Sequence, residues 1–268
     1  MRLAFLGSGS RGNGTLLEAD GHRLLIDCGF SVRDATRRAA QLDVDLASLD
    51  AILVTHEHSD HSSGVAALSR QFRIPVYMTH GTCASGRIDG CAAIHCFDAD
   101  SEWSLGPFRI RAVAVPHDAR EPVQYCVESA GQRVGVLTDL GSATPHVCRA
   151  FDDCDALVLE FNHDRQMLSA GPYPPALKRR VGGDWGHLSN DQALALLQRL
   201  DLQRLQTLVI AHMSEKNNHR SVVEGLLEQH LPELLPRTRW AEQDQALDWI
   251  AARLSVSERP VADALLVS

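Results

Sequence analysis

The chain has 268 residues, and its 34 acidic and 26 basic side chains give a formal net charge of −8 with histidine neutral. That length fits one large domain or two small ones, and a composition of 44% hydrophobic and 22% charged residues excludes wholesale disorder. The acidic balance argues against a protein that coats nucleic acid through a broad basic surface, although it leaves room for a local basic groove.

Seven cysteines without a Cys-x-x-Cys pair predict neither a disulfide framework nor a thiolate zinc site. The amino-terminal segment turns polar after Leu6, which is too early for the core of a signal peptide. No apolar run approaches the length of a membrane-spanning helix. We therefore expect a cytoplasmic protein with reduced thiols and no membrane partner.

The first elements in chain order are a strand, a hairpin and a helix. Residues 2–6 predict a strand, and two apolar runs at 15–19 and 22–27 predict a hairpin. Asp20-Gly21 between these runs is typical of a type I′ turn, which needs a positive φ at both positions. Helical periodicity follows over 31–42.

A glycine-rich segment, Gly7-Ser8-Gly9-Ser10-Arg11-Gly12, separates the first strand from the hairpin and matches the pattern G-x-G-x-x-G. In a dinucleotide-binding protein a helix begins at the third glycine and its amino terminus holds the pyrophosphate. Here the chain enters a hairpin, so we expect no nucleotide cofactor. We interpret the segment as a turn at which the backbone approaches another part of the chain closely.

The remainder of the chain alternates between further strands and helices. Apolar runs predict strands at 51–55, 75–78, 108–115, 123–128, 133–138, 156–160 and 207–211. Ser189 and Gln192 fit a capping box that begins a helix ending near Leu200, and a last helix is predicted over about 242–254. The stretch 165–188, which contains several Gly and Pro, predicts a functional loop. These elements predict one α/β domain over 1–268, a sandwich rather than a doubly wound parallel sheet.

The segment His56-Glu57-His58-Ser59-Asp60-His61 comes directly after the predicted strand 51–55. Imidazoles and carboxylates are suitable ligands for a divalent metal ion. His56 and His58 can point the same way from an extended segment and share one ion, whereas Asp60 and His61 can reach a second ion. Glu57 and Ser59 are spacers or groups that orient the imidazoles.

Three further candidate ligands follow predicted strands in the same way: His117, Asp139 and His212. The carboxyl ends of strands in an open α/β sheet gather ligands at one edge. We expect His56, His58 and His117 to hold one ion, Asp60, His61 and His212 to hold the other, and Asp139 to bridge. Two such ions can share a hydroxide nucleophile near neutral pH, which predicts a hydrolase.

These motifs resemble those of the metallo-β-lactamase fold superfamily, in which His-x-His-x-Asp-His is followed by a histidine, an aspartate and a histidine. The likeness is narrower to the YycJ/WalJ branch. It runs from residue 2 to about 220 through the segments 7–13, 26–29, 56–61, 116–119, 138–141, 162–164, 186–190 and 211–218.

The resemblance implies a four-layer αββα sandwich with a dinuclear site at the carboxyl-terminal edge of the strands. It also implies a DNA 5′→3′ exonuclease that uses two divalent ions, zinc or manganese. By similarity to related phosphodiesterases, His187 is expected to protonate the leaving group, Glu160 to orient His187, and Asp60 to complete the catalytic set. The expected substrate contacts are Asn13, His163, Asp164, Arg165, Lys178, Arg179 and Arg180.

Three alternatives to a DNA exonuclease stay open. A phosphodiesterase for cyclic or mononucleotides suits a chain of net charge −8, because binding of duplex DNA favours a broad basic surface. A thioester or lactone hydrolase is a second alternative, although Val115-Pro116-His117-Asp118 lacks the thioesterase pattern Gly-His-Thr-Pro-Gly. The third is a metal-binding regulatory protein without turnover, against which the complete ligand set argues. The expected partner is DNA or another phosphodiester, and the sequence leaves the oligomeric state open.

Overall fold

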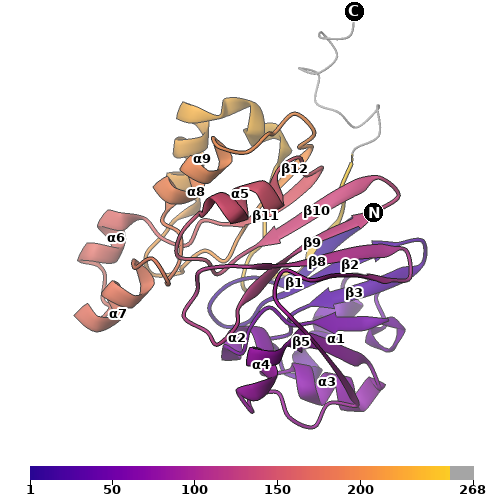
Figure 1. Ribbon diagram of the computed structural model, residues 1–268. Coiled ribbons are helices and arrows are strands. Elements are labelled where there is room, and N and C mark those ends of the chain that lie inside the picture. Colours follow the sequence, from indigo (N-terminus) through magenta and orange to yellow (C-terminus); the bar gives the residue numbers. More distant parts are fainter. Residues whose placement is uncertain (254–268) are drawn as a thin grey trace, which may run out of the picture.

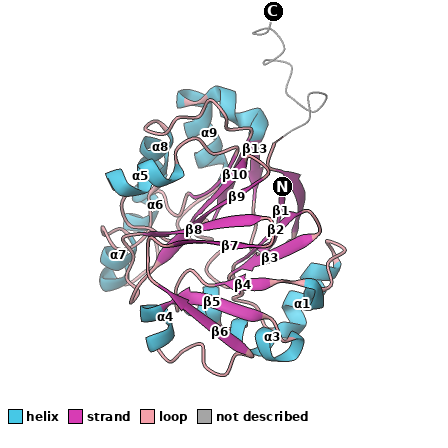
Figure 2. Ribbon diagram, turned by 45° about the vertical axis from the view of Figure 1, so that its right-hand side comes forward, coloured by secondary structure: helices cyan, strands magenta, loops and turns pink. Residues whose placement is uncertain are grey.

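The structure is a computed structural model, and it describes residues 1–253. Two mixed sheets of seven strands each lie face to face in the middle of the molecule (Figures 1 and 2). The first sheet has the order β14 (Leu247–Ala251), β1 (Arg2–Gly7), β2 (Gly14–Ala19), β3 (His22–Ile26), β4 (Ala51–Leu53), β5 (Pro75–Thr79), β6 (Ala93–Phe97). The second has the order β13 (Thr238–Trp240), β12 (Thr207–Ala211), β11 (Ala156–Glu160), β10 (Gln132–Leu137), β9 (Val123–Ser129), β8 (Phe108–Ala114), β7 (Glu102–Leu105).

Helices cover the outer face of each sheet (Figure 2). Those that follow strands of the first sheet are α1 (Val32–Ala40), α2 (Ser59–Ser62), α3 (Val65–Phe72) and α4 (His80–Ala84). The helices in the second half are α5 (Pro145–Phe151), α6 (Arg165–Ala170), α7 (Pro175–Val181), α8 (Asn190–Leu197) and α9 (Arg220–His230). Two 3₁₀ turns lie at Leu46–Ser48 and Pro232–Arg237.

The buried side chains form three apolar layers, which makes the molecule a four-layer αββα sandwich. In β1, Leu3 and Phe5 pack between the two sheets, whereas Ala4 and Leu6 pack toward α1 and α3. The third layer lies between the second sheet and the helices α5, α8 and α9. Because these strands are buried on both faces, their sequences are continuous apolar runs. The predicted fold class is confirmed.

Strand direction places the candidate residues at one edge of the second sheet. β10, β11 and β12 are parallel, and β8 runs the same way because both β8 and β10 pair antiparallel with β9. Their carboxyl ends therefore meet at one edge. In the first sheet β3 and β4 are parallel, so their carboxyl ends also lie side by side.

Most predicted elements are confirmed to within a few residues. Asp20 and Gly21 have φ angles of 49° and 79°, as a type I′ turn requires. At the start of α8, Ser189 Oγ accepts a hydrogen bond from the Gln192 amide at 3.3 Å, and Gln192 Oε1 accepts one from the Ser189 amide at 3.0 Å. The glycine-rich segment leads into β2 without a helix, as predicted.

The helix predicted over about 242–254 is wrong. Within the described residues this stretch contains the strand β14, which pairs antiparallel with β1, while residue 254 lies outside the described part. β1 would otherwise be an open sheet edge, and pairing it decides the conformation of a segment whose apolar pattern fits either element. Because residues 254–268 are not described, one domain over 1–268 stays a prediction.

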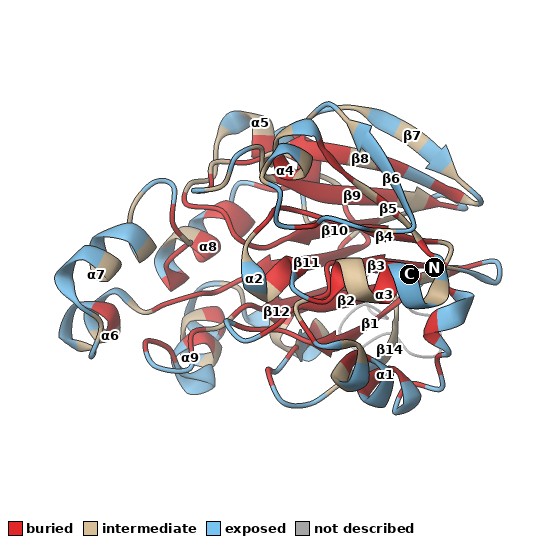
Figure 3. Ribbon diagram, turned by 90° about the horizontal axis from the view of Figure 1, so that it is seen from below, coloured by how far each residue is buried: buried red, intermediate tan, exposed pale blue. Residues whose placement is uncertain are grey.

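The loop predicted over 165–188 is also wrong in its local structure, because it contains the short helices α6 and α7. Asp164 caps α6 by accepting a hydrogen bond from the Met167 amide, and Pro175 stands in the first turn of α7, where its missing N–H costs nothing. The two helices extend to one side of the sandwich (Figures 1 and 3). Within the described residues, no helix is long and apolar enough to cross a membrane.

Candidate metal centre

The segment that follows β4 changes direction in its middle. His56 is fully buried, and His58 is still extended, with φ −64° and ψ 147°, where it precedes the first residue of α2. Asp60 and His61 lie within α2, which directs them to a second position beside the first, with the ring centroids of His56 and His61 4.4 Å apart. The change from strand to helix therefore divides one six-residue motif between two neighbouring positions.

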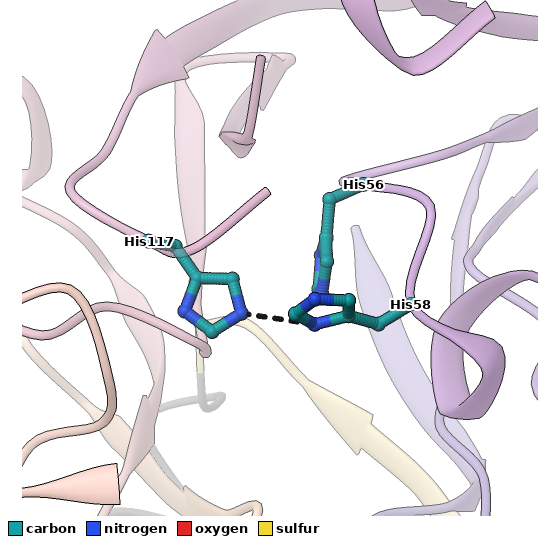
Figure 4. A group of neighbouring side chains, drawn as sticks. All are labelled: His56, His58 and His117. Atoms are coloured by element: carbon teal, nitrogen blue, oxygen red, sulfur yellow. Dashed lines mark hydrogen bonds between the residues drawn. The ribbon is translucent and has the colours of Figure 1, made fainter. Parts of the chain in front are cut away.

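His56, His58 and His117 form the first group of candidate ligands. One nitrogen from each of the three rings lies within 4.8 Å of the others, and the rings meet edge to face. His117 comes from the end of β8 in the second sheet, and its Nε2 lies 3.2 Å from His58 Nδ1 (Figure 4). His56 Nε2 is buried and has no hydrogen-bond partner in the structure.

The second group consists of Asp60, His61 and His212, whose candidate ligand atoms also lie within 4.8 Å of one another. Asp60 Oδ2 is 3.5 Å from His61 Nε2 and 3.4 Å from His212 Nε2. Asp139 lies between the two groups, with its Oδ2 2.9 Å from His61 Nε2, and it also forms a cluster with His56 and His61. The structure thus brings together all seven predicted ligands.

Partners outside the cluster hold three of the imidazoles. Thr55 Oγ1 lies 2.9 Å from His56 Nδ1, Asp27 Oδ2 lies 2.8 Å from His61 Nδ1, and the Gly186 carbonyl oxygen lies 3.0 Å from His117 Nδ1. A partner on Nδ1 selects the tautomer and leaves Nε2 for a metal ion. Each of these rings is therefore already oriented toward the centre.

Asp27 is a residue of the candidate site that the sequence prediction missed. Besides His61, its carboxylate accepts hydrogen bonds from the backbone amide and the hydroxyl of Thr55. The available signal was its position directly after β3, which is the same strand-end position that identified the ligands. Asp27, Asp139 and His212 all have φ between 48° and 61°, a left-handed conformation that non-glycine residues rarely adopt and that is typical of functional sites.

Gly29 allows the loop after β3 to approach α2. A Cβ atom at Gly29 would lie 1.9 Å from the Asp60 carbonyl oxygen, which is far inside van der Waals contact. The Asn13 side chain, from the glycine-rich segment, donates to the same carbonyl at 3.3 Å and lies 3.1 Å from His61 Nε2. Glycine and asparagine thus hold two loops against the ligand-bearing helix.

The five candidate imidazoles differ in the direction of their pKa shifts. Burial lowers the pKa of His56, His58 and His117, so they are neutral at pH 7. Burial acts in the same direction on His61 and His212, but the carboxylates of Asp139 and Asp60 outweigh it. The pKa of His61 is raised well above its usual value, and that of His212 is raised to about 10.

The pKa values of the two carboxylates are shifted downward. Burial alone would raise their pKa values, but the positive charge of His61 and His212 lowers the pKa of Asp60 and holds that of Asp139 well below its usual value. One buried and one partly exposed carboxylate among imidazoles, with the unpartnered His56 Nε2 beside them, form a donor set that fits divalent metal ions.

A carboxylate–histidine pair adjoins the cluster. Glu160, fully buried at the end of β11, places its Oε2 3.1 Å from His187 Nδ1 and accepts hydrogen bonds on Oε1 from the Leu140 and Leu188 amides. His187 Nδ1 also lies 3.4 Å from Asp139 Oδ1. The imidazole is partly exposed, so it connects the buried cluster with solvent.

The predicted substrate contacts separate into two sets. His163, Arg165, Lys178 and Arg179 line one pocket of about 450 Å³, together with Asp184, and we call it the basic pocket.

The other predicted contacts lie elsewhere. Arg180 pairs with Asp118, beside His58 and His117. Asp164 caps α6, and the side chain of Asn13 is buried and occupied by hydrogen bonds with the protein, so neither is placed to contact a substrate.

Comparison with known proteins reveals relatives that extend over most of the chain. A family model described as beta-lactamase superfamily domain matches residues 22–213. The chain is 31% identical over 242 residues to "Exodeoxyribonuclease WalJ" of Streptococcus pneumoniae, covering 86% of this chain and 90% of that protein. It is 30% identical over 238 residues to "Exodeoxyribonuclease YycJ" of Bacillus anthracis, covering 87% and 90%.

A solved structure agrees with the fold. Zn(2+)-bound PqqB from Methylobacterium extorquens matches 92% of this chain and 100% of its own, with a TM-score of 0.69 and 16% sequence identity. At that identity the match supports the shared αββα sandwich alone. The resemblance to the exonuclease branch rests on the two relatives of higher identity and is confirmed by them.

Proposed function

The chain belongs to the beta-lactamase superfamily and is a metal-dependent hydrolase, and we propose that it is a DNA 5′→3′ exonuclease with a centre for two divalent ions. The observation that carries the proposal is the pair of adjoining ligand groups joined by Asp139, with the Glu160–His187 pair beside them. Relatives named exodeoxyribonucleases along nearly the whole chain support DNA as the substrate.

In this proposal the ligands divide as the geometry groups them. His56, His58 and His117 would hold one ion and Asp60, His61 and His212 the other, and Asp139, which clusters with a histidine of each group, would be available to both. When bound, two divalent ions supply a hydroxide nucleophile near neutral pH and neutralise the charge of the phosphodiester. Zinc and manganese both suit nitrogen and carboxylate ligands.

His187 supplies the proton that the leaving alkoxide needs. Its Nδ1 is occupied by Glu160, so Nε2 is the atom available to the leaving oxygen. Glu160 cannot turn away, because its other oxygen accepts two backbone hydrogen bonds. Glu160 therefore orients the imidazole.

The experiment combines metal analysis with DNA digestion. Purified protein should contain divalent metal by elemental analysis and, with added manganese or zinc, should release mononucleotides progressively from the 5′ end of labelled DNA. Asp60→Ala should abolish digestion, and His187→Ala should lower kcat about 10²–10⁴-fold, the usual contribution of a general acid. His230→Ala, which removes an exposed imidazole at the end of α9, is the control.

Three outcomes would contradict the proposal. Cleavage of bis-p-nitrophenyl phosphate without any digestion of DNA would favour a small-molecule phosphodiesterase. Cleavage of thioesters alone would remove both phosphodiester functions. Bound metal without activity on any of these substrates would favour a metal-binding protein without turnover.

A further inference from the structure

The basic pocket concentrates positive charge on an acidic protein. Arg165, Lys178 and Arg179 line it, against the single carboxylate of Asp184, whereas the whole chain has a net charge of −8. Its volume of about 450 Å³ lies within the range of small-molecule sites. A local excess of cations in a concave site favours an anionic ligand of small size.

The cations of the pocket are only weakly engaged by the protein. The Arg179 side chain is exposed and makes no hydrogen bond or ion pair within the described part of the chain. Arg165 donates to Ser189 Oγ at 3.1 Å and lies 3.8 Å from Asp191 in a pair whose side chains are both more than 60% exposed. Lys178 donates to the Ser169 carbonyl at 2.5 Å. No buried carboxylate neutralises these groups, so they are available to an anion such as phosphate.

An exposed indole follows the lining of the pocket in the chain. Trp185 directly follows Asp184 of the lining, and at 64% it is the most exposed of the large hydrophobic side chains in the described residues. An exposed indole costs solvation free energy unless a ligand covers it, and aromatic side chains beside basic grooves stack on nucleobases. The pocket and the indole together suit a phosphate joined to a base.

The segment after α7 connects this pocket to the metal centre. The Val181 carbonyl accepts a hydrogen bond from the His187 amide at 2.8 Å, and the Gly186 carbonyl holds His117. A Cβ atom at Gly186 would lie 2.1 Å from the Arg180 carbonyl oxygen, so this close backbone turn requires glycine. The pocket therefore lies on the side of the centre from which His187 acts.

We propose that the basic pocket binds the 5′-phosphate of the terminal nucleotide of DNA and that Trp185 stacks on its base. The inference rests on the proposed exonuclease function. Hydrolysis that breaks the P–O3′ bond transfers the oxygen of water to phosphorus, and the proton of His187 goes to O3′. Because O3′ belongs to the terminal nucleotide, that nucleotide lies on the His187 side, where the pocket is.

This placement explains how the enzyme selects a 5′ end and continues along the strand. The products are a nucleoside 5′-monophosphate and a shortened strand whose new first nucleotide carries the phosphate on its 5′ oxygen. Each turnover therefore regenerates the group that the pocket recognises. A pocket of limited volume on the leaving-group side admits one nucleotide and disfavours cleavage within a strand.

The test compares two single-stranded DNA substrates of one sequence that differ in a 5′-phosphate or a 5′-hydroxyl. We expect the metal-loaded wild-type protein to digest the phosphorylated strand with kcat/KM higher by about tenfold or more, which is the contribution of a charge-assisted contact. Arg179→Ala should bring the ratio of kcat/KM for the phosphorylated strand to kcat/KM for the hydroxyl strand close to one. Arg179→Lys should restore part of this ratio. Arg149→Ala, which removes an exposed arginine on α5, should leave the ratio unchanged.

The role of Trp185 has its own measurement. Trp185→Ala should raise KM for the phosphorylated strand with a smaller effect on kcat, and Trp185→Phe should recover most of the affinity because an aromatic face remains. Mass spectrometry of the products should identify nucleoside 5′-monophosphates.

The outcomes separate the two proposals. If the wild-type protein digests both substrates with equal kcat/KM, and Arg179→Ala does not change that ratio, the pocket assignment is overturned. The exonuclease function is then still supported. Release of nucleoside 3′-monophosphates overturns the placement of the terminal nucleotide. A protein that digests neither strand overturns the proposed function, and the pocket assignment fails with it.

Discussion

Three imidazoles of the candidate centre have a partner on Nδ1 that leaves Nε2 free. For His61 that partner is Asp27, which also receives both hydrogen-bond donors of Thr55. Thr55 in turn contacts His56, so one carboxylate stabilises an imidazole in each ligand group. Asp27 is therefore the residue outside the ligand set on which the geometry of both groups depends.

Asp27→Asn is expected to weaken metal binding about 10–100-fold, the usual effect of losing a group that orients a ligand. The amide keeps the shape of the side chain but offers only one acceptor oxygen in place of two. Metal affinity measured by competition with a chelator checks the prediction. Asp98→Asn, at a side chain that is 91% exposed, is the control, and equal affinity in both variants would contradict the role of Asp27.

Metal binding is also expected to release protons. In the metal-free chain the pKa of His212 is raised to about 10 and that of His61 is well above its usual value, so both rings are protonated at pH 7. Only a neutral imidazole binds a metal ion, so each ring must lose its proton. Affinity should therefore rise between pH 6 and pH 8, by about tenfold per pH unit for each proton released.

Titration calorimetry at one pH in two buffers of different ionisation enthalpy measures these protons directly. The apparent binding enthalpy should differ between the buffers in proportion to the number released. Identical enthalpies in the two buffers would show that no net protons are released, which would contradict the assignment of His61 and His212 as ligands.

Among the elements, β14 shows how the edge of a sheet determines local structure. It covers β1, and Trp249 within it donates a hydrogen bond to the Leu42 carbonyl at 3.1 Å while the guanidinium of Arg2 lies over its ring. The strand is therefore attached to the sheet through backbone pairing and one large side chain.

Trp249→Ala is expected to lower the free energy of unfolding by about 2 kcal/mol, because most of a large apolar side chain loses its contacts. Denaturant unfolding followed by circular dichroism measures the change. Trp185→Ala is the matched control, since the same substitution at an indole that is 64% exposed should change the stability little. Equal effects at the two positions would contradict the packing described for β14.

The whole molecule combines an acidic surface with a site suited to anions. Bound divalent ions and the three cations of the basic pocket supply positive charge locally, so a net charge of −8 does not prevent recognition of a phosphodiester. The same charge balance limits how far a nucleic-acid interface can extend beyond the site.

Salt should consequently affect DNA digestion only moderately. Contacts from three cations to a single strand predict that log kcat/KM falls against log salt concentration with a slope of about −2. Steady-state kinetics on a short single strand between low and physiological salt check this value. A slope steeper than about −4 would indicate a much wider basic interface than the pocket provides.

Much of the fold could be predicted because the information is local. The Asp20-Gly21 turn and the Ser189–Gln192 capping box each lie within a few consecutive residues, and both are present as predicted. The errors at 165–188 and 242–254 have a different origin. The helices α6 and α7 are too short for a clear apolar period, and the pairing of β14 depends on β1, some 245 residues away in the chain.

The sequence by itself determined the chemical types of the candidate ligands and their positions after strands. Imidazole and carboxylate donors are properties of single residues, and strand ends are visible in a local apolar pattern. Only the tertiary structure decided that Asp27 supports His61, that Arg180 pairs with Asp118 instead of lining the basic pocket, and that Trp185 is exposed. These relations join distant segments, so they depend on how the two sheets and their loops pack rather than on any local pattern.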